Sequence, residues 1–445
     1  MLERLFKLSA NNTNIRTEIR AGIVTFMTMA YIIFVQPFIM MEAGMDFGAV
    51  MVATCLSAAL ATLVMAFGAN YPIALAPCMG ENVFFVSVAT GAVTGVAIGW
   101  EAALTAVFIS GALFLVLSLF KFREKVFDSI PLSMKASISV GIGLFIALLG
   151  LKNAGIIMKA PSPGVLVQLG HLTSKPTLLA IGGLLLVAIL IALRVRGALL
   201  IGLVATALAG IPLGIVEFQG VVEAPPSLAP VLFKLDFSSI WDLSMITVVA
   251  IFLFMVLFDT IGTLIGVGQQ AGLLNAEGKL ERAGKALMAD AVGTTCGSLI
   301  GSSTVSSYME SAAGVSEGGR TGLCAVVAAV LFMLSIFFAP IVRMVGAGYP
   351  IEGGVVLNPV TAPALIIVGY FMVRGVRNIP WEEPTEGIPA FITMIGIPLS
   401  NIGDGIALGF IAYTLIKLFS GRGRDVSLLV YIMTALLIVL FAVRM

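Results

Sequence analysis

The chain has 445 residues, of which 59% are hydrophobic and only 11% are charged, and its formal net charge is +1. Soluble domains draw about 25% of their residues from Asp, Glu, Lys and Arg, so this composition excludes a soluble fold and predicts an all-α protein that crosses a bilayer many times. A net charge close to zero, with basic residues scattered in pairs, also argues against nucleic-acid binding.

Apolar stretches of about 20 residues, the length that crosses a bilayer as a helix, recur along the whole chain. In the first half (1–217) a shorter, broken stretch at 74–90 accompanies stretches at 20–41, 47–69, 97–120, 133–151, 177–193 and 197–217. In the second half (244–420) a broken stretch at 303–316 accompanies stretches at 244–270, 284–300, 321–342, 358–374, 386–400 and 404–420. We therefore predict fourteen transmembrane segments, seven in each half.

One apolar segment does not fit this count. Residues 426–443 are apolar enough to span the membrane, which leaves three interpretations: a fifteenth span, a surface helix, or a wrong count within 386–420. Pro389 and Pro398 make that last region the hardest to assign, because proline interrupts helical hydrogen bonding.

Basic residues fall in alternate connections, as expected if cytoplasmic loops are rich in Lys and Arg. With the N-terminus inside, the inner connections contain Lys121, Arg123, Lys125, Arg194, Arg196, Lys279, Arg282, Lys285, Arg320, Arg374, Arg377, Arg422 and Arg424. The 218–243 connection between the halves has one Lys against three acidic residues and is predicted to lie outside. An odd number of spans per half inverts the second half relative to the first, which is the inverted-repeat arrangement of many secondary transporters.

The two broken segments are the most informative feature of the chain. The first reads Ala76-Pro77-Cys78-Met79-Gly80-Glu81-Asn82, and the second runs from Ser302 to Ser311 and includes Glu310. Interrupted apolar segments at corresponding places in two halves mark the midplane binding site of secondary transporters. The pattern therefore favours transport over catalysis.

Few ionisable residues fall within the predicted spans, and each costs about 2.5–3.5 kcal/mol on insertion scales, so each is a candidate for function. Asp259 lies deep in an apolar stretch, with Thr263 one turn further along on the same face. Glu310 and Glu81 are expected near the ends of half-helices whose free backbone groups face one another across a cavity. Asp290 is expected to support the site without touching the substrate. For each carboxylate, a purely structural role is the alternative.

Polar and sulfur-containing neighbours complete the expected substrate site, which comprises Asp259, Glu310, Glu81, Asn82, Thr263, Met309 and Ser311. The sole histidine, His171, falls in an outer connection, so proton coupling would depend on a buried carboxylate, Asp259 or Glu310. Burial favours the protonated form of such a group. A single histidine excludes paired-histidine zinc motifs, and no phosphate-binding Gly-Lys-Ser/Thr loop is present. We therefore expect no metal, no cofactor and no enzymatic activity.

The cysteines do not suggest redox chemistry. All four lie in apolar or small-residue segments, where thiols act as small hydrophobic side chains. They are poor candidates for a disulfide framework. They are Cys55, Cys78, Cys296 and Cys324.

At these residues the sequence resembles the AzgA-like purine permeases, a branch of the nucleobase cation symporters. The resemblance runs from about Asn14 to about Ser420, and its most specific parts are Phe258–Thr263, Asp290–Thr294 and Gly301–Gly322. It implies a seven-plus-seven inverted repeat like that of the bacterial uracil transporter. It also implies a core domain, at about 20–120 and 244–342, and a gate domain, at about 133–217 and 358–420.

The resemblance further implies import of adenine, guanine or hypoxanthine across the cytoplasmic membrane by proton symport. The substrate would lie between the two domains, held by Asp259 and by a carboxylate and backbone groups around Glu310. Thr263 occupies the place where the uracil transporter carries a histidine, so the role of that histidine does not carry over. The resemblance also suggests a homodimer joined through the gate domain.

One departure from the family pattern stands beside the expected site. AzgA-like proteins commonly read Met-Gly-Leu-Asn where this chain has Met79-Gly80-Glu81-Asn82. The extra carboxylate of Glu81 is expected to alter either the purine preference or the coupling proton. It also increases the likeness between the halves, since Glu81 roughly mirrors Glu310.

Two other classes of protein were weighed against a purine importer. An anion transporter of the same inverted-repeat fold is the main alternative, but the carboxylates near the site would repel anions and no intramembrane Arg or Lys would offset them. A membrane enzyme such as a lipid transferase would need polar groups clustered at one membrane face. The candidate residues instead lie at midplane depth in opposite halves.

Overall fold

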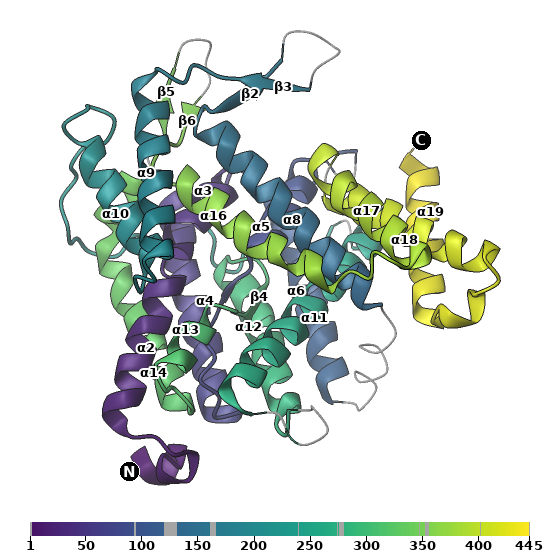
Figure 1. The fold of residues 1–445 in the computed structure, drawn as a ribbon, viewed down its shortest axis with the longest axis horizontal. Helices are drawn as coiled ribbons and strands as arrows, with labels where there is room; N and C mark the ends of the chain where they lie inside the picture. Colours follow the sequence, from purple (N-terminus) through teal and green to yellow (C-terminus); the bar gives the residue numbers. More distant parts are fainter. Residues whose placement is uncertain are drawn as a thin grey trace.

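The computed structural model describes residues 2–92, 95–119, 131–160, 166–238, 240–273, 275, 280–346, 348–351, 356–400 and 402–444. Within these residues the chain is mostly helical (Figure 1). The first half contains α1 (Leu2–Phe6), α2 (Ile15–Met29), α3 (Ile32–Met41), α4 (Phe47–Gly68), α5 (Met79–Ala89), α6 (Gly99–Leu119), α8 (Leu132–Asn153), α9 (Lys175–Ala192) and α10 (Ala198–Gly210). The second half contains α11 (Leu243–Ala271), α12 (Ala283–Ile300), α13 (Ser311–Ser316), α14 (Gly322–Ser335), α15 (Ala339–Gly346), α16 (Ala362–Val373), α17 (Pro384–Leu399), α18 (Ile402–Phe419) and α19 (Leu428–Arg444).

The described chain contains three short antiparallel strand pairs. One joins segments from the two halves of the chain, and the other two join segments close in sequence. They are β1 (Leu75–Pro77) with β4 (Val305–Ser307), β2 (Ile157–Lys159) with β3 (Val167–Leu169), and β5 (Tyr349–Pro350) with β6 (Val356–Leu357). Of these, β4 lies in the middle of the molecule, surrounded by helices (Figure 1). Short 3-10 helices occupy Ser9–Asn11, Ile336–Phe338, Arg374–Asn378 and Gly423–Asp425.

Eight helical stretches of the described chain are long and apolar enough to cross a membrane. They are Ile15–Met41, Phe47–Gly68, Gly99–Ser118, Leu132–Asn153, Lys175–Ala192, Met245–Ala271, Gly322–Gly346 and Ile402–Phe419. The prediction of a mostly helical membrane protein is therefore confirmed. Each of the fourteen predicted ranges contains a helix, but the count of fourteen crossings stays a prediction. Among the basic residues used to predict the orientation, Lys121, Arg123, Lys125 and Lys279 lie outside the described residues.

Two predicted spans are not single helices. The first divides at Ala30 and Tyr31, between α2 and α3. The 321–342 span consists of α14, a 3-10 turn and α15. In the second case Pro340 explains the tighter turn, since proline has no N–H to donate to the carbonyl of Ile336. The first division places Tyr31 at the start of α3, where it contributes to the site described below.

The helices form two groups according to which of them pack together. Helices α2, α4, α6, α11, α12 and α14 pack mainly among themselves, and so do α8, α9, α10, α16, α17 and α18. Gly143 of α8 and Gly369 of α16 face each other so closely that a Cβ on either would lie within 3.0 Å of the carbonyl oxygen of the other. Such close approach through small residues is a common basis of helix packing in membranes. Helix α5 packs mainly on α6 and α3 and so joins the first group. The two groups meet where α5 contacts α8 and α18 and where α10 contacts α2.

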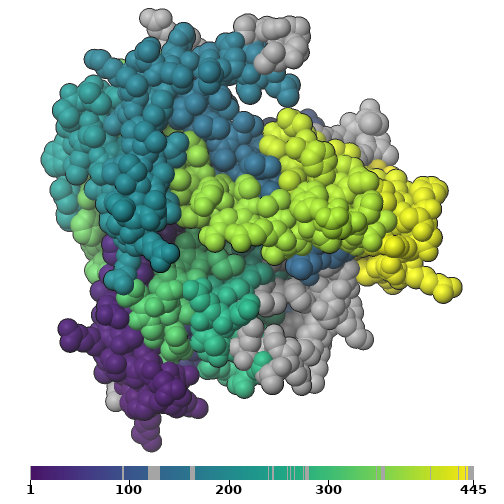
Figure 2. All heavy atoms as spheres, viewed as in Figure 1, coloured from purple at the N-terminus to yellow at the C-terminus, as the bar shows by residue number. Residues whose placement is uncertain are grey.

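The C-terminal segment forms α19 at the edge of the molecule. Figure 2 shows the C-terminal helices, yellow-green to yellow, at one side of the surface. Helix α19 packs against α18, and the hydroxyls of Thr434 and Thr414 are hydrogen-bonded at 2.7 Å. The segment 426–443 is thus a helix attached to α18, and its three interpretations, a fifteenth span, a surface helix or a wrong count within 386–420, stay predictions.

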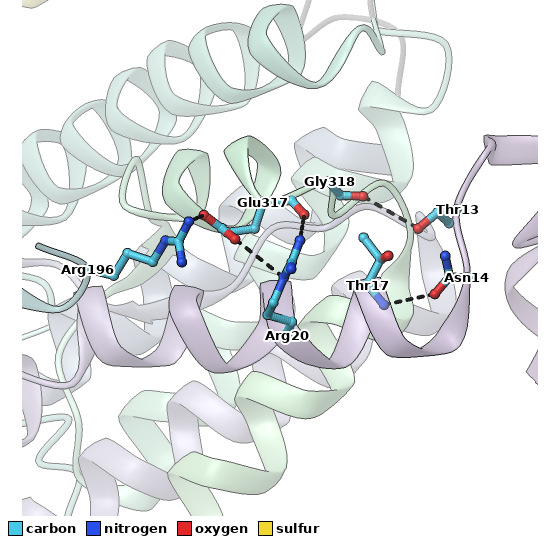
Figure 3. A network of polar contacts seen from close by, with 7 residues as sticks. All are labelled: Thr13, Asn14, Thr17, Arg20, Arg196, Glu317 and Gly318. Atoms are coloured by element: carbon cyan, nitrogen blue, oxygen red, sulfur yellow. Dashed lines mark hydrogen bonds and ion pairs between the residues drawn. The ribbon is translucent and has the colours of Figure 1, made fainter. Parts of the chain in front are cut away.

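An ion-pair network connects the two helix groups near the N-terminal end of α2 (Figure 3). Glu317 directly follows α13, and its Oε1 lies 2.5 Å from Nη2 of Arg196, in the connection between α9 and α10. Nε of Arg20, on α2, lies 3.4 Å from the other oxygen of Glu317. The carboxylate of Glu317 therefore contacts one cation from each group of helices.

Glu18 stabilises the start of α14 from a position on α2. Its side chain is fully buried, and its carboxylate accepts hydrogen bonds from the backbone N–H groups of Arg320 (2.9 Å), Thr321 (3.3 Å) and Cys324 (3.1 Å). The first N–H groups of a helix have no partner within the helix. Glu18 supplies the missing acceptor and so holds α2 against α14.

Replacing Glu18 by Ala should destabilise the protein, because a buried donor left without an acceptor costs about 1–3 kcal/mol. We expect a clearly lower apparent melting temperature for the purified protein in detergent, and a smaller loss for Glu18→Gln, which keeps one acceptor oxygen. Glu3→Ala is the control, since that carboxylate accepts from Ser9 at an exposed position. Equal melting temperatures for Glu18→Ala and Glu3→Ala would contradict this role of Glu18.

Candidate functional site

The two interrupted segments meet in the strand pair β1 and β4. Leu75 pairs with Ser307, Ala76 with Ser306 and Pro77 with Val305, and all six residues are buried. The ladder continues at both ends, where the Cys78 N–H donates to the Thr304 carbonyl and the Tyr308 N–H to the Ala74 carbonyl, each at 3.0 Å. For these strand residues the expectation of free backbone groups facing one another across a cavity is therefore corrected, while for the first groups of the two half-helices it stays a prediction. The backbone groups of the strands bond directly, because an unpaired backbone group at membrane depth costs several kcal/mol.

Each strand leads into a short helix that begins near a predicted carboxylate. Cys78 precedes α5 and Glu81 lies in its first turn, while Glu310 immediately precedes α13. Because the strands are paired, the two helix starts are held on either side of one ladder. The sequence indicated where the segments break, but not that they pair.

Asp259 of α11 is bound to both interrupted segments. Its Oδ2 accepts a hydrogen bond from the Ser306 hydroxyl at 2.7 Å and another from the Cys78 thiol at 3.3 Å. One ligand atom from each of Cys78, Glu81 and Asp259 lies within 4.8 Å of the other two. The structure thus brings two predicted site carboxylates together around a thiol. Cys78 is a polar member of the site and not only the small hydrophobic residue that we expected.

Glu310 is held by a residue that the sequence analysis missed. The hydroxyl of Tyr31 donates to Glu310 Oε1 at 2.9 Å, and Thr28 donates to the Glu310 carbonyl at 3.3 Å. Tyr308, also missed, donates its hydroxyl to the Pro77 carbonyl at 2.5 Å and so ties the two segments together. A tyrosine in an apolar span needs a partner for its hydroxyl when buried, which is the signal that could have identified both residues.

Asp290 is held by hydrogen bonds from Thr260 and Ser307. It is fully buried on α12 and accepts from the Thr260 hydroxyl (2.5 Å), the Ser307 N–H (3.0 Å) and the Ser307 hydroxyl (2.9 Å). These bonds join α12 to α11 and to β4. They are the contacts of a residue that anchors the ladder.

The other predicted site residues differ in how they relate to the ladder. Ser311 is buried, and its hydroxyl accepts from the Ala74 N–H at 3.0 Å. Asn82 is buried and accepts from the Ser303 hydroxyl, and its amide nitrogen has no protein partner in the described residues. Met309 is 49% exposed and lies against Gly266 of α11. Thr263 is buried, and no hydrogen bond links it to a carboxylate within the described part of the chain.

The cluster of Cys78, Glu81 and Asp259 is the only group of at least three His, Cys, Asp or Glu side chains, among those that the structure describes, close enough to hold a metal ion. Zinc sites in proteins have four ligands, or three with a water. Two of the three groups here already hydrogen-bond to each other, through the Cys78 thiol and Asp259. These three side chains therefore offer a metal ion no more than the smallest number of ligands seen in zinc sites.

These features define a class of protein: a multi-pass helical membrane protein in which buried and partly buried carboxylates gather at the junction of two interrupted segments. The comparisons with known proteins agree. The Permease family (Xan_ur_permease) matches residues 16–403, and the chain belongs to this family.

The relatives confirm the resemblance to purine permeases. The chain is 50% identical to the permease MJ0326 of Methanocaldococcus jannaschii, over 100% of this chain and 98% of that protein. It is 44% identical to the adenine permease AdeP of Escherichia coli, over 98% and 95% of the two chains. It is 41% identical to the guanine/hypoxanthine permease PbuO of Bacillus subtilis, over 97% and 98%.

Solved structures with a similar fold have little sequence identity to this chain. The transmembrane domain of the cyanobacterial bicarbonate transporter BicA matches with a TM-score of 0.64 and 16% identity, over 88% of this chain and 97% of that one. The structure of SLC26A9 matches with a TM-score of 0.63 and 11% identity, over 91% and 66%. These likenesses show the fold alone.

Asp290 and Asp259 should differ in their effect on stability. Asp290→Ala leaves three buried donors without an acceptor, at about 1–3 kcal/mol each, and should lower the melting temperature of the purified protein. Asp259→Asn keeps an acceptor for Ser306 and removes a charge beside Glu81, so its melting temperature should equal or exceed that of the wild type. A less stable Asp259→Asn than Asp290→Ala would show that the roles are reversed.

Proposed function

We propose that the protein is a secondary active transporter that imports purine nucleobases (adenine, guanine or hypoxanthine) across the cytoplasmic membrane by proton symport. The observation that carries this proposal is the way in which Asp259 is held. Ser306 and Cys78 both donate to Oδ2, and Oδ1 accepts no hydrogen bond from a protein donor in the described residues. One oxygen fixes the orientation of the carboxylate, and the other is available to a ligand.

A purine base offers what such an acceptor needs. Its ring N–H and amino groups are donors, and a hydrogen bond to a charged acceptor contributes about 1.5–3 kcal/mol. Glu310, held at Oε1 by Tyr31, provides a second carboxylate from the other interrupted segment. The names of the adenine and guanine/hypoxanthine permeases among the relatives support the same substrate class.

The anion alternative has less support. The structural neighbours include a bicarbonate transporter and an anion transporter, but at 11–16% identity they share only the fold. No Lys or Arg forms an ion pair with Asp259, Glu81, Asp290 or Glu310 in the described part of the chain. An anion placed here would meet uncompensated carboxylates, and like charges repel.

The two groups of helices suggest how transport proceeds. The first group corresponds to the proposed core domain (20–120 and 244–342) and the second to the proposed gate domain (133–217 and 358–420). Gly80, beside Glu81, faces Ile142 of α8. A Cβ added at Gly80 would lie 3.0 Å from the nearest side-chain carbon of Ile142. The site therefore lies close to the boundary between the groups, and movement of the core against the gate exposes it to each side in turn. The proposal includes fourteen spans in two inverted repeats, a cytoplasmic N-terminus and a homodimer through the gate domain.

Asp259→Asn should reduce purine uptake at least about tenfold, because it removes the charged acceptor that binds the base. The measurement is uptake of labelled adenine, guanine, hypoxanthine, xanthine and uracil in cells that lack their own carriers, with and without a protonophore. Immunodetection in the membrane fraction controls for expression. The proposal predicts that the wild type takes up purine in a saturable way and that this uptake collapses with the proton gradient. Normal uptake by Asp259→Asn would remove Asp259 from the mechanism.

Joining Arg196 to Glu317 should stop transport if the two groups move against each other at this end. In an Arg196→Cys and Glu317→Cys double variant, a cleavable bifunctional thiol reagent should lower uptake severalfold, and cleavage of the linker should restore it. The wild type and both single variants, treated alike, control for reaction at the native cysteines. Full uptake by the cross-linked protein would rule out separation of the groups at this contact.

A further inference from the structure

We propose that Glu81 and Asp259 form a carboxyl pair that holds one proton, with the Cys78 thiol between them, and that this pair is the proton-binding group of the transport cycle. The inference rests on the proposed function and deepens it. It gives Glu81 a role beyond direct contact with the substrate.

The geometry of three side chains carries the inference. Cys78 precedes α5 and Glu81 follows it by three residues, so both lie at the same end of one helix. The Cys78 sulfur, one carboxylate oxygen of Glu81 and one of Asp259 all lie within 4.8 Å of one another. The thiol donates a hydrogen bond to Asp259 Oδ2 at 3.3 Å. Glu81 is only 2% exposed. Asp259 and Cys78 are partly buried. Two carboxylates from different helices therefore lie close together at the start of α5.

Two ionised carboxylates at this distance repel strongly. At an effective dielectric constant of about 20, two unit charges no more than 4.8 Å apart repel by roughly 3.5 kcal/mol or more. One proton removes most of this repulsion, so the pair binds its first proton more firmly than a lone carboxylate would, and the proton belongs to the pair and not to one residue.

Two other carboxyl groups, Glu310 and Asp290, interact electrostatically with Asp259, and protein donors hold both of them. Glu310 is held by Tyr31, and Asp290 by Thr260 and Ser307. The helices packed against α5 and α11 carry other titratable groups, but none of these forms an ion pair with Glu81 or Asp259 in the described residues. They are Glu101 of α6, Lys135 and Lys152 of α8, Lys285 and Cys296 of α12, Asp404, Tyr413 and Lys417 of α18, and Tyr431 of α19.

The pair links proton binding to substrate binding. When one proton occupies an oxygen of the pair, the pair offers one O–H donor and one charged acceptor, which complement a ring nitrogen and an N–H group of the base. Loss of the proton removes the donor and leaves the ring nitrogen facing a carboxylate, which weakens the site for the base. Only an O–H bond forms and breaks in this step, and the proton comes from and returns to water on either side of the membrane.

Uptake by Glu81→Gln as a function of external pH tests the pair. Gln keeps the shape but removes the neighbouring charge that helps to retain the proton, so the fall in uptake on the alkaline side should move to lower pH by about one unit or more. Glu81→Asp should retain most of the wild-type profile. Glu101→Gln is the matched control at an acidic residue outside the site and should leave the profile unchanged. An unshifted profile in an active Glu81→Gln protein overturns the pair while leaving purine transport intact.

Infrared spectroscopy of the purified protein tests the pair independently of transport. At neutral pH the wild type should show a protonated-carboxyl C=O band that is lost in Glu81→Gln and in Asp259→Asn but retained in Glu101→Gln. Absence of the band in the wild type overturns the inference. If the band is present but the wild type takes up no purine, the proposed function fails and the pair stands.

Discussion

The antiparallel pairing of β1 with β4 is the interaction on which the rest of the site depends. Two segments that leave their helices inside a membrane must satisfy their backbone groups, and here each satisfies the other. Successive residues of a strand point to opposite faces, so Ser306 is directed to Asp259 and Ser307 to Asp290. One face of β4 thus orients the carboxylate proposed to bind substrate, while the other is fixed to α12 by the carboxylate that anchors the ladder.

The sequence predicted the parts of this arrangement that depend on local pattern. The apolar stretches indicated the helices, and the cost of charge in a membrane identified Asp259, Glu310, Glu81 and Asp290. It did not predict the ladder, because a pairing between Ala76 and Ser306 leaves no local signal. It also missed Tyr31: the need of a buried hydroxyl for a partner was a usable signal, but the partner, Glu310, lies far away in the sequence. Cys78 looked apolar because its neighbours in sequence are apolar, whereas its neighbours in space are carboxylates.

The short helix α13 connects the site with the contact between the two helix groups. Glu310 precedes this helix and is bonded to Tyr31, while Glu317 follows it and pairs with Arg196. Thr28 of α2 donates to the Glu310 carbonyl, and Arg20 of α2 pairs with Glu317. Both ends of α13 are therefore bonded to the same neighbouring helix. A rearrangement at Glu310 therefore has a short, continuous path to the ion pair that joins the two groups of helices.

Direct binding to the purified protein tests the central claim, that the carboxylates around the paired strands bind a purine base. The measurement is calorimetric titration of the wild type and of Asp259→Asn with adenine, guanine and hypoxanthine, and with bicarbonate as a representative anion. It distinguishes a purine transporter from an anion transporter. The account predicts saturable binding of at least one purine, loss of that binding in Asp259→Asn, and no binding of bicarbonate. Binding of bicarbonate without any purine, or purine binding that survives the substitution, would contradict it.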